Sequence, residues 1–105
     1  MAVMVICVYQ PKSGKEEELQ ALLGEHHSTL RSLELTTDFV YYARAATGSW
    51  LELFEWVSED HSRSAHDIPA VMEIWGRLSE VCDFKPLASL EEVKSPFSHF
   101  TPQAP

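Results

Sequence analysis

The hydrophobic and polar positions of this chain form a series of patterns, and each pattern predicts one element of secondary structure. Residues 3–9 alternate between two sets that are both largely apolar, which predicts a strand covered on both faces and central in its sheet. Residues 11–14 form a turn. Residues 15–33 then predict a helix, because glutamates fill its first turn and apolar side chains recur at helical spacing. The apolar stripe of this helix is Leu19, Leu22, Leu23, His26, Leu30 and Leu33.

Two further strands follow as a hairpin. Residues 39–45 and 50–57 are rich in aromatic and β-branched side chains, and Gly48 and Ser49 make a turn between them. Ser58 can cap a short helical turn over residues 59–65, and Pro69 suits the start of a second helix that runs to about residue 82. The predicted apolar stripe of that helix is Ile68, Val71, Met72, Trp75, Leu78 and Cys82.

The last part of the chain predicts one more strand and a tail. Residues 84–90 can form a short strand, and Pro86 suits an edge or a bulge better than a central position. From Ser95 onward we expect little regular structure, although Phe97 and Phe100 suggest that the tail packs on the rest of the protein. We therefore divide the chain into a domain over residues 1–92 and a C-terminal tail over residues 93–105.

The order of the predicted elements indicates an α+β fold. Strand, helix, strand, strand, helix, strand is the ferredoxin-like βαββαβ arrangement, an antiparallel sheet with the first and third strands in the middle. Helices cover only one face of such a sheet. Aromatic residues make up 10% of the chain, and several lie on the strands, so we expect a second copy of the chain to cover the other face. The sequence thus predicts a symmetric homodimer.

Composition and charge exclude several classes of protein. A chain of 105 residues has room for one hydrophobic core, and 45% hydrophobic residues is typical of a globular protein. A net charge of −8, with the basic residues scattered, argues against nucleic acid and anionic membranes as partners. The apolar run over residues 1–10 is too short for a signal peptide or a membrane span, so we expect a cytoplasmic protein.

Motifs for metals and cofactors are missing from the sequence. Cys7 and Cys82 have no metal-binding or redox spacing, and we expect both to be buried reduced thiols. His26 and His27 are adjacent on the predicted helix, so their side chains diverge by about 100° and cannot bind one zinc ion. The segment PKSGK lacks the spacing of a phosphate-binding loop. We predict no metal and no cofactor.

Several segments together resemble the antibiotic biosynthesis monooxygenase domain, a family of the dimeric α/β-barrel superfamily. The resemblance covers roughly residues 4–90. It includes an LxxLLxxHH helix, the strand LELFEWVSED, the segment SAHDIP and a helix ending IWGRL. The resemblance rests chiefly on the W-x-S-E residues of LELFEWVSED and on the A-H residues of SAHDIP.

The resemblance implies a homodimer whose two sheets form a barrel, with a pocket between the sheet and the helices of each subunit. Some members of this family oxidise polycyclic aromatic substrates with molecular oxygen and without metal or flavin, others degrade haem, and many have no assigned activity. The haem-degrading members have an asparagine, a tryptophan and a histidine where this chain has Cys7, His66 and Trp75 or Gly76. Haem degradation is therefore disfavoured.

Two histidines are candidates for the chemistry. His66 lies between the short helical turn and the helix that starts at Pro69, and an imidazole there could exchange a proton with a phenol or quinol. The alternative is a histidine that caps a free carbonyl. His26 lies within the leucine stripe, where it is either a hydrogen-bonded core residue or a residue facing a ligand.

Other candidates would line a binding site. Tyr42 and Arg44 could orient a phenolate or an acid, and Trp75 could stack on a flat ligand; packing in the core or at a dimer interface is the alternative for the aromatic residues. Glu52 and Glu55 lie on opposite faces of one apolar strand, so one of them faces a covered side and needs a partner, either Arg44 or Tyr42.

Three functions are consistent with these patterns. The first is a cofactor-independent monooxygenase that acts on a small aromatic or quinone-like substrate, with His66 as the catalytic residue and His26, Tyr42, Arg44 and Trp75 as substrate-binding residues. The second is a small-molecule-binding protein without chemistry. The third is a structural dimer whose interior is filled by aromatic side chains.

Overall fold

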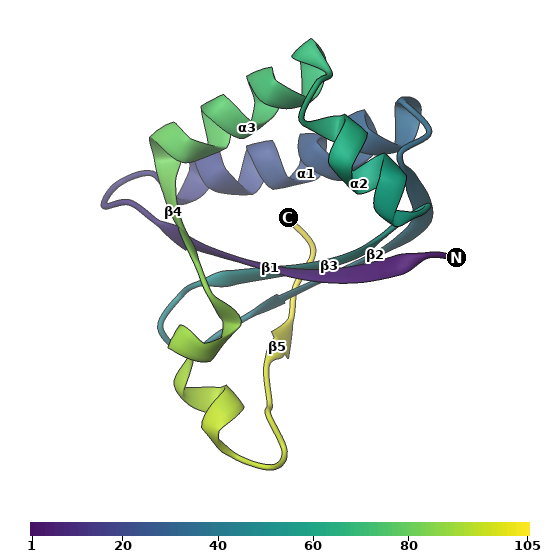
Figure 1. Cartoon of the computed structure of the whole chain (residues 1–105). Coiled ribbons are helices and arrows are strands. Elements are labelled where there is room, and N and C mark those ends of the chain that lie inside the picture. The colour runs from purple at the N-terminus through teal and green to yellow at the C-terminus, as the bar shows by residue number, and fades with distance from the viewer.

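The strands of the protein form one antiparallel sheet, and three α-helices lie on one face of it (Figure 1). The computed structural model describes residues 1–105. None of its helices is both long and apolar enough to cross a membrane. The elements are β1 (Val3–Pro11), α1 (Glu16–Ser32), β2 (Thr36–Arg44), β3 (Trp50–Trp56), α2 (Glu59–Ala65), α3 (Pro69–Val81), β4 (Cys82–Lys85), η1 (Leu87–Ser89), η2 (Glu91–Lys94) and β5 (Thr101–Pro102).

The sheet has the order β4-β1-β3-β2-β5. The predicted α+β class and the roughly ferredoxin-like order are therefore confirmed, with β1 and β3 inside the sheet. Local signals explain the helix starts: Ser58 accepts a hydrogen bond from the backbone N–H of His61 at the start of α2, and Pro69 occupies the first turn of α3.

The C-terminal part of the chain differs from the prediction. The fourth strand covers Cys82–Lys85, not residues 84–90, because Pro86 follows it and lacks the N–H that a continuing ladder would need. Residues 87–94 instead form the two 3-10 turns, η1 and η2. The tail is also not wholly irregular, since β5 pairs with Ala43 and Arg44 at the free edge of β2.

The two faces of the sheet are covered unequally. Helices cover the side chains of Val5, Cys7 and Tyr9, whereas η1, η2 and the tail cover only part of the opposite, outer face (Figure 1). Met4 and Ile6 on that outer face are 56% and 36% exposed. Within a single chain the outer face of the N-terminal half of β1 is therefore uncovered, and its predicted cover by a second copy stays a prediction.

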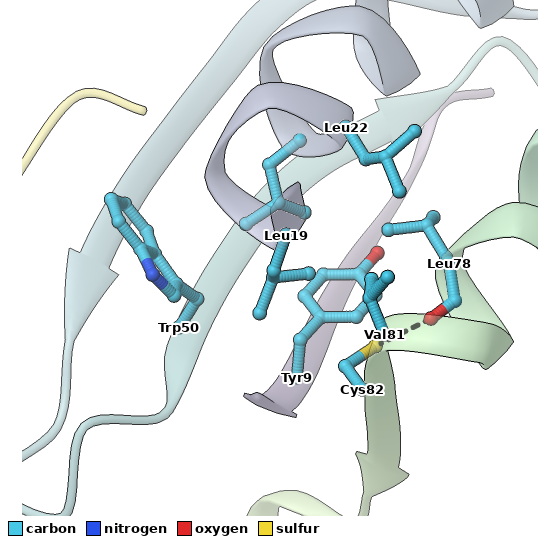
Figure 2. Close-up of a cluster of buried hydrophobic side chains, with 8 residues drawn as sticks. Tyr9, Leu19, Leu22, Trp50, Leu78, Val81 and Cys82 are labelled. Carbon is cyan, nitrogen blue, oxygen red and sulfur yellow. Dashed lines mark hydrogen bonds between the residues drawn. The ribbon is translucent and has the colours of Figure 1, made fainter. Parts of the chain in front are cut away.

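The core between sheet and helices consists of two clusters. One surrounds Tyr9, which lies among leucines of α1 and α3 near Val81 and Cys82, as Figure 2 shows. The other surrounds Phe54 and Trp56 on β3. Cys7 and Trp75 pack against both clusters. Two predicted stripe residues lie outside the core, since Leu33 is 37% and Met72 47% exposed.

Candidate functional site

A buried carboxylate lies at the centre of the helix-covered face. Glu52 on β3 is fully buried and accepts hydrogen bonds from the Tyr9 hydroxyl at 2.7 Å and from Nδ1 of His26 at 2.9 Å. The Tyr42 hydroxyl lies 3.2 Å from Oε2 of Glu52 and 3.0 Å from the carbonyl oxygen of Leu23, so its single proton serves two acceptors. We call Tyr9, His26, Tyr42, Glu52 and Trp75 the Glu52 network.

Trp75 fixes the protonation state of His26. The indole Nε1–H of Trp75 donates to Nε2 of His26 at 3.0 Å, and an indole nitrogen can only donate. Nε2 must therefore carry a lone pair, which places the single imidazole proton on Nδ1, where it faces Glu52. In this arrangement His26 is neutral, and it is oriented from both sides.

The carboxylate of Glu52 consequently has hydrogen-bond donors but no cationic partner. The only basic side chain within ion-pair distance is His26, which holds no charge while Trp75 donates to it. A buried carboxylate without a counter-charge is costly for the folded state. Groups of this kind are concentrated at functional sites, because catalysis and binding use the charge that the fold leaves unmatched.

This carboxylate affects its neighbours. Burial, reinforced by the negative charge of Glu52, raises the pKa of the Cys7 thiol to about 12. The same two causes raise the pKa of Tyr9 well above its ordinary value and raise that of Tyr42. Both phenols therefore remain protonated hydrogen-bond donors, and Cys7 remains a thiol.

An apolar cavity adjoins the network. Its volume is about 350 Å³, at the lower end of the range for small-molecule pockets. It lies where the two core clusters meet, bordered by β1, β3, β4, α1 and α3. The lining residues, which define what we call the β1–α3 cavity, are Val5, Cys7, Val8, Tyr9, His26, Phe54, Trp56, Trp75, Leu78, Phe84 and Lys85.

Three of the predicted site residues come together in this region. His26 and Trp75 both line the β1–α3 cavity, and Tyr42 joins them through Glu52. His26 on α1 and Tyr42 on β2 come from consecutive elements, whereas Trp75 on α3 lies 49 positions from His26 in the sequence. The sheet register makes the meeting possible, because Tyr42 and Cys7 flank Glu52 on the neighbouring strands.

His66 and Arg44 lie elsewhere. His66 is exposed after the end of α2, and its ring meets the edge of Trp75 with centroids 5.0 Å apart, but it does not line the cavity. Arg44 lies at the β2–β3 hairpin, where its guanidinium stacks 4.6 Å from the ring centroid of Trp50 and donates to the carbonyl of Gly48. Of the two residues that were predicted as partners of the buried glutamate, Arg44 makes no hydrogen bond to Glu52, whereas Tyr42 does.

Sequence reasoning did not assign Tyr9 or Cys7 to the site and left Glu52 and Glu55 undecided. Glu52 faces the helices, whereas Glu55 lies on the outer face and accepts a hydrogen bond from Thr37 at 2.8 Å. Period-two alternation from Trp50 and Phe54, both core residues, is the signal that would have placed Glu52 inside. No group of three His, Cys, Asp or Glu side chains is placed to hold a metal ion.

The cavity cysteine gives a first prediction. Because the pKa of Cys7 rises from 9.0 to about 12, its thiolate fraction at neutral pH is roughly a thousand times smaller than that of a free cysteine. We expect iodoacetamide to alkylate Cys7 slowly in the native protein and faster in the Glu52→Gln variant. Mass spectrometry measures the rate of alkylation in each. Fast labelling of native Cys7 would contradict this electrostatic description.

His27 gives a second prediction, on pH. It is 8% exposed, its Nε2 bonds to the carbonyl of Thr37 at 3.2 Å, and burial lowers its pKa below 6.5. The unfolded chain therefore binds the proton more readily, so stability is lost as the pH falls below that ordinary value, by at most about 1.4 kcal/mol per pH unit. Urea unfolding across this range should show a smaller loss for His27→Gln than for the wild type. The exposed His99→Gln variant is the control, and equal losses in all three proteins would contradict the prediction.

Comparisons with known proteins identify no family and no relative for this chain. No protein-family model, no curated protein and no solved structure matches the chain.

Proposed function

We propose that the protein is a cofactor-independent monooxygenase of the antibiotic biosynthesis monooxygenase type, acting on a small aromatic or quinone-like substrate in the β1–α3 cavity. The observation that carries this proposal is an imidazole held by a buried carboxylate in the wall of an apolar cavity. Glu52 orients His26 through Nδ1 and would stabilise its protonated form, which makes Nε2 a general base. The roughly ferredoxin-like strand order also supports the family assignment.

The chemistry needs only a base, a dry site and oxygen. Removing a proton from a hydroxylated aromatic substrate gives an electron-rich anion, which can pass electrons to molecular oxygen. In overall balance, an activated CH₂ group and O₂ give C=O and H₂O. The largely apolar lining would disfavour water beside the anion and the oxygenated intermediate.

Oxygen consumption tests the proposal. The purified protein is mixed with anthrones, naphthols and hydroquinones in an oxygen electrode, and products are analysed by mass spectrometry under isotopically heavy oxygen gas. We expect uptake above the uncatalysed rate and one heavy oxygen atom in the product of at least one compound. Compounds that bind but are recovered unchanged, with no oxygen consumed, would contradict the monooxygenase.

One observation favours a second function, a binding protein without chemistry. His26 is 2% exposed and both of its ring nitrogens already have hydrogen-bond partners, as expected for a structural histidine. The cavity alone would then hold an aromatic ligand, and unchanged recovery of a bound ligand is the outcome that this function predicts.

We also propose that the protein is a homodimer that forms the dimeric α/β barrel. The outer face carries an apolar row across three strands, since Ile6 and Tyr41 both pair with Leu53. Tyr41 is 50% exposed, and Met4 and Phe39, two residues before Ile6 and Tyr41 on their strands, extend the exposed apolar surface in the same direction. We call these five residues the outer patch, and a second copy of the sheet is the partner whose shape and chemistry match it.

Introducing a negative charge into the outer patch by substitution should dissociate the proposed dimer. We expect sedimentation equilibrium to show a dimer for the wild type and a monomer for Ile6→Glu or Tyr41→Glu, because a buried unpaired carboxylate at the interface opposes association. Phe97→Glu is the matched control, since Phe97 is 79% exposed but lies on the tail. A wild-type monomer at every concentration would rule out the barrel.

A further inference from the structure

Trp75 and His26 present an unusual pair of groups to the same cavity. Both residues line the β1–α3 cavity, and the donor of one is hydrogen-bonded to the acceptor of the other at 3.0 Å. The pair is therefore closed on itself while no ligand is bound. A ligand oxygen that bears a proton could satisfy both groups at once, because it can give its proton to Nε2 and then accept the indole N–H.

We infer that the site binds an acidic hydroxyl compound, a phenol or an enol, as its oxyanion, held between the protonated His26 and the indole N–H of Trp75. This inference rests on the proposed function and names the ionic form in which the substrate is held. The ligand O–H bond breaks, its proton goes to Nε2 of His26, and the electron pair stays on the ligand oxygen. Trp75 thereby changes from a group that blocks the base to a group that stabilises the anion.

The charges around His26 support this arrangement. Before the transfer, Glu52 is a buried carboxylate whose only basic neighbour is neutral. After the transfer, the imidazolium lies between two anions, Glu52 on Nδ1 and the ligand oxygen on Nε2, and the net charge of ligand and site together is unchanged. The proton thus supplies the counter-charge that Glu52 lacks, which favours ionisation of the ligand inside the cavity.

Trp75 has room to make this change. Its side chain is only partly buried, and one of the rings that it contacts belongs to the exposed His66. Trp75 packs at the margin of both core clusters, and a small rotation of its indole away from Nε2 would open a place for one oxygen atom beside the cavity. Hydrogen bonds to a charged oxygen are stronger than those to a neutral nitrogen, so the indole N–H gains from the exchange.

The ionisation of para-nitrophenol tests the inference, because the phenolate is yellow and the phenol is not. The protein is titrated into para-nitrophenol in oxygen-free buffer, at a pH below the pKa of the free compound. We expect phenolate absorbance to rise with the bound fraction, measured in parallel by equilibrium dialysis. Binding of the colourless phenol, or no binding at all, would overturn the inference whatever the oxygen electrode shows.

Single substitutions test the roles of Trp75 and His26 separately. Trp75→Phe keeps the aromatic ring but removes the N–H, and we expect the phenolate-to-phenol ratio of the bound compound to fall about tenfold. His26→Asn should bind the compound without ionising it, while His99→Asn should behave as the wild type. Equal phenolate in wild type and Trp75→Phe would overturn the role of the indole. Para-nitroanisole, which has no proton to give, should bind more weakly than para-nitrophenol, and equal binding would contradict the oxyanion.

Discussion

Replacing His26 by asparagine is expected to lower kcat/KM for oxygen-dependent turnover by about 10²–10⁴-fold, the usual contribution of a positioned general base. Asparagine can still donate to Glu52, but it offers no basic nitrogen to the β1–α3 cavity. The measurement is the initial rate of oxygen uptake as a function of substrate concentration, with the melting temperature of each variant recorded to exclude unfolding.

Two other histidine variants make this test specific. His99→Asn changes an exposed residue of the tail and should leave turnover unchanged. His66→Asn examines the residue that the sequence favours as the catalytic one. Because the imidazole of His66 reaches Trp75 but does not line the cavity, we expect a smaller loss than in His26→Asn. A larger loss in His66→Asn would show that the base is His66 and that the assignment of His26 is wrong.

Replacing Glu52 by alanine is expected to lower the free energy of unfolding by about 3–5 kcal/mol, as judged by urea unfolding. The change leaves the hydroxyl of Tyr9 and Nδ1 of His26 without an acceptor and opens a void in the fully buried centre of the sheet. Glu55→Ala on the same strand is the matched control, and its loss should be about 1 kcal/mol, because it breaks one hydrogen bond at a partly exposed position. Similar losses for the two variants would contradict the central role of Glu52.

Glu52→Gln separates shape from charge. The amide oxygen can still accept from Tyr9 and His26, and the amide N–H₂ can donate to Tyr42, whose own proton then goes to the carbonyl of Leu23. We expect this variant to lie within about 1 kcal/mol of the wild type in stability. It would nevertheless lose turnover, because no negative charge remains to stabilise a protonated His26. Full turnover in a stable Glu52→Gln protein would rule out the proposed electrostatic role.

The fold was largely predictable from the sequence where a pattern depends on local chemistry. Alternating side chains predicted the strands β1 and β3, and leucines at helical spacing predicted the helix α1. Ser58 and Pro69 predicted where α2 and α3 start. The prediction failed after Lys85, because apolar residues near Leu87 and Leu90 resemble a strand. In the structure they instead form turns that pack on Val8 and Leu51 of the outer face. Only tertiary packing decides whether these residues form a strand or 3-10 turns.

The sequence identified only some residues of the candidate site and none of its geometry. His26, Tyr42 and Trp75 were identified from chemistry, yet nothing in their spacing shows that they converge on Glu52. That convergence depends on the pairing of β2 with β3 and on the docking of α1 and α3 over the sheet, and the docking joins residues that are distant in the sequence. His66 was favoured because it lies between the short helical turn and the helix that starts at Pro69, but the turn after α2 directs it to the surface.

The strand order also has a consequence for how the chain folds. The β2–β3 hairpin is local and can form early, and it already places Tyr42 beside Glu52. Tyr9, His26 and Trp75 arrive only when β1 inserts next to β3 and the helices dock, steps that close long loops and set the folding rate. We therefore expect Glu52 to stay hydrated until β1 and the helices dock during folding. The electrostatic cost of burying its carboxylate would then arise late in folding and would speed unfolding more than it slows folding.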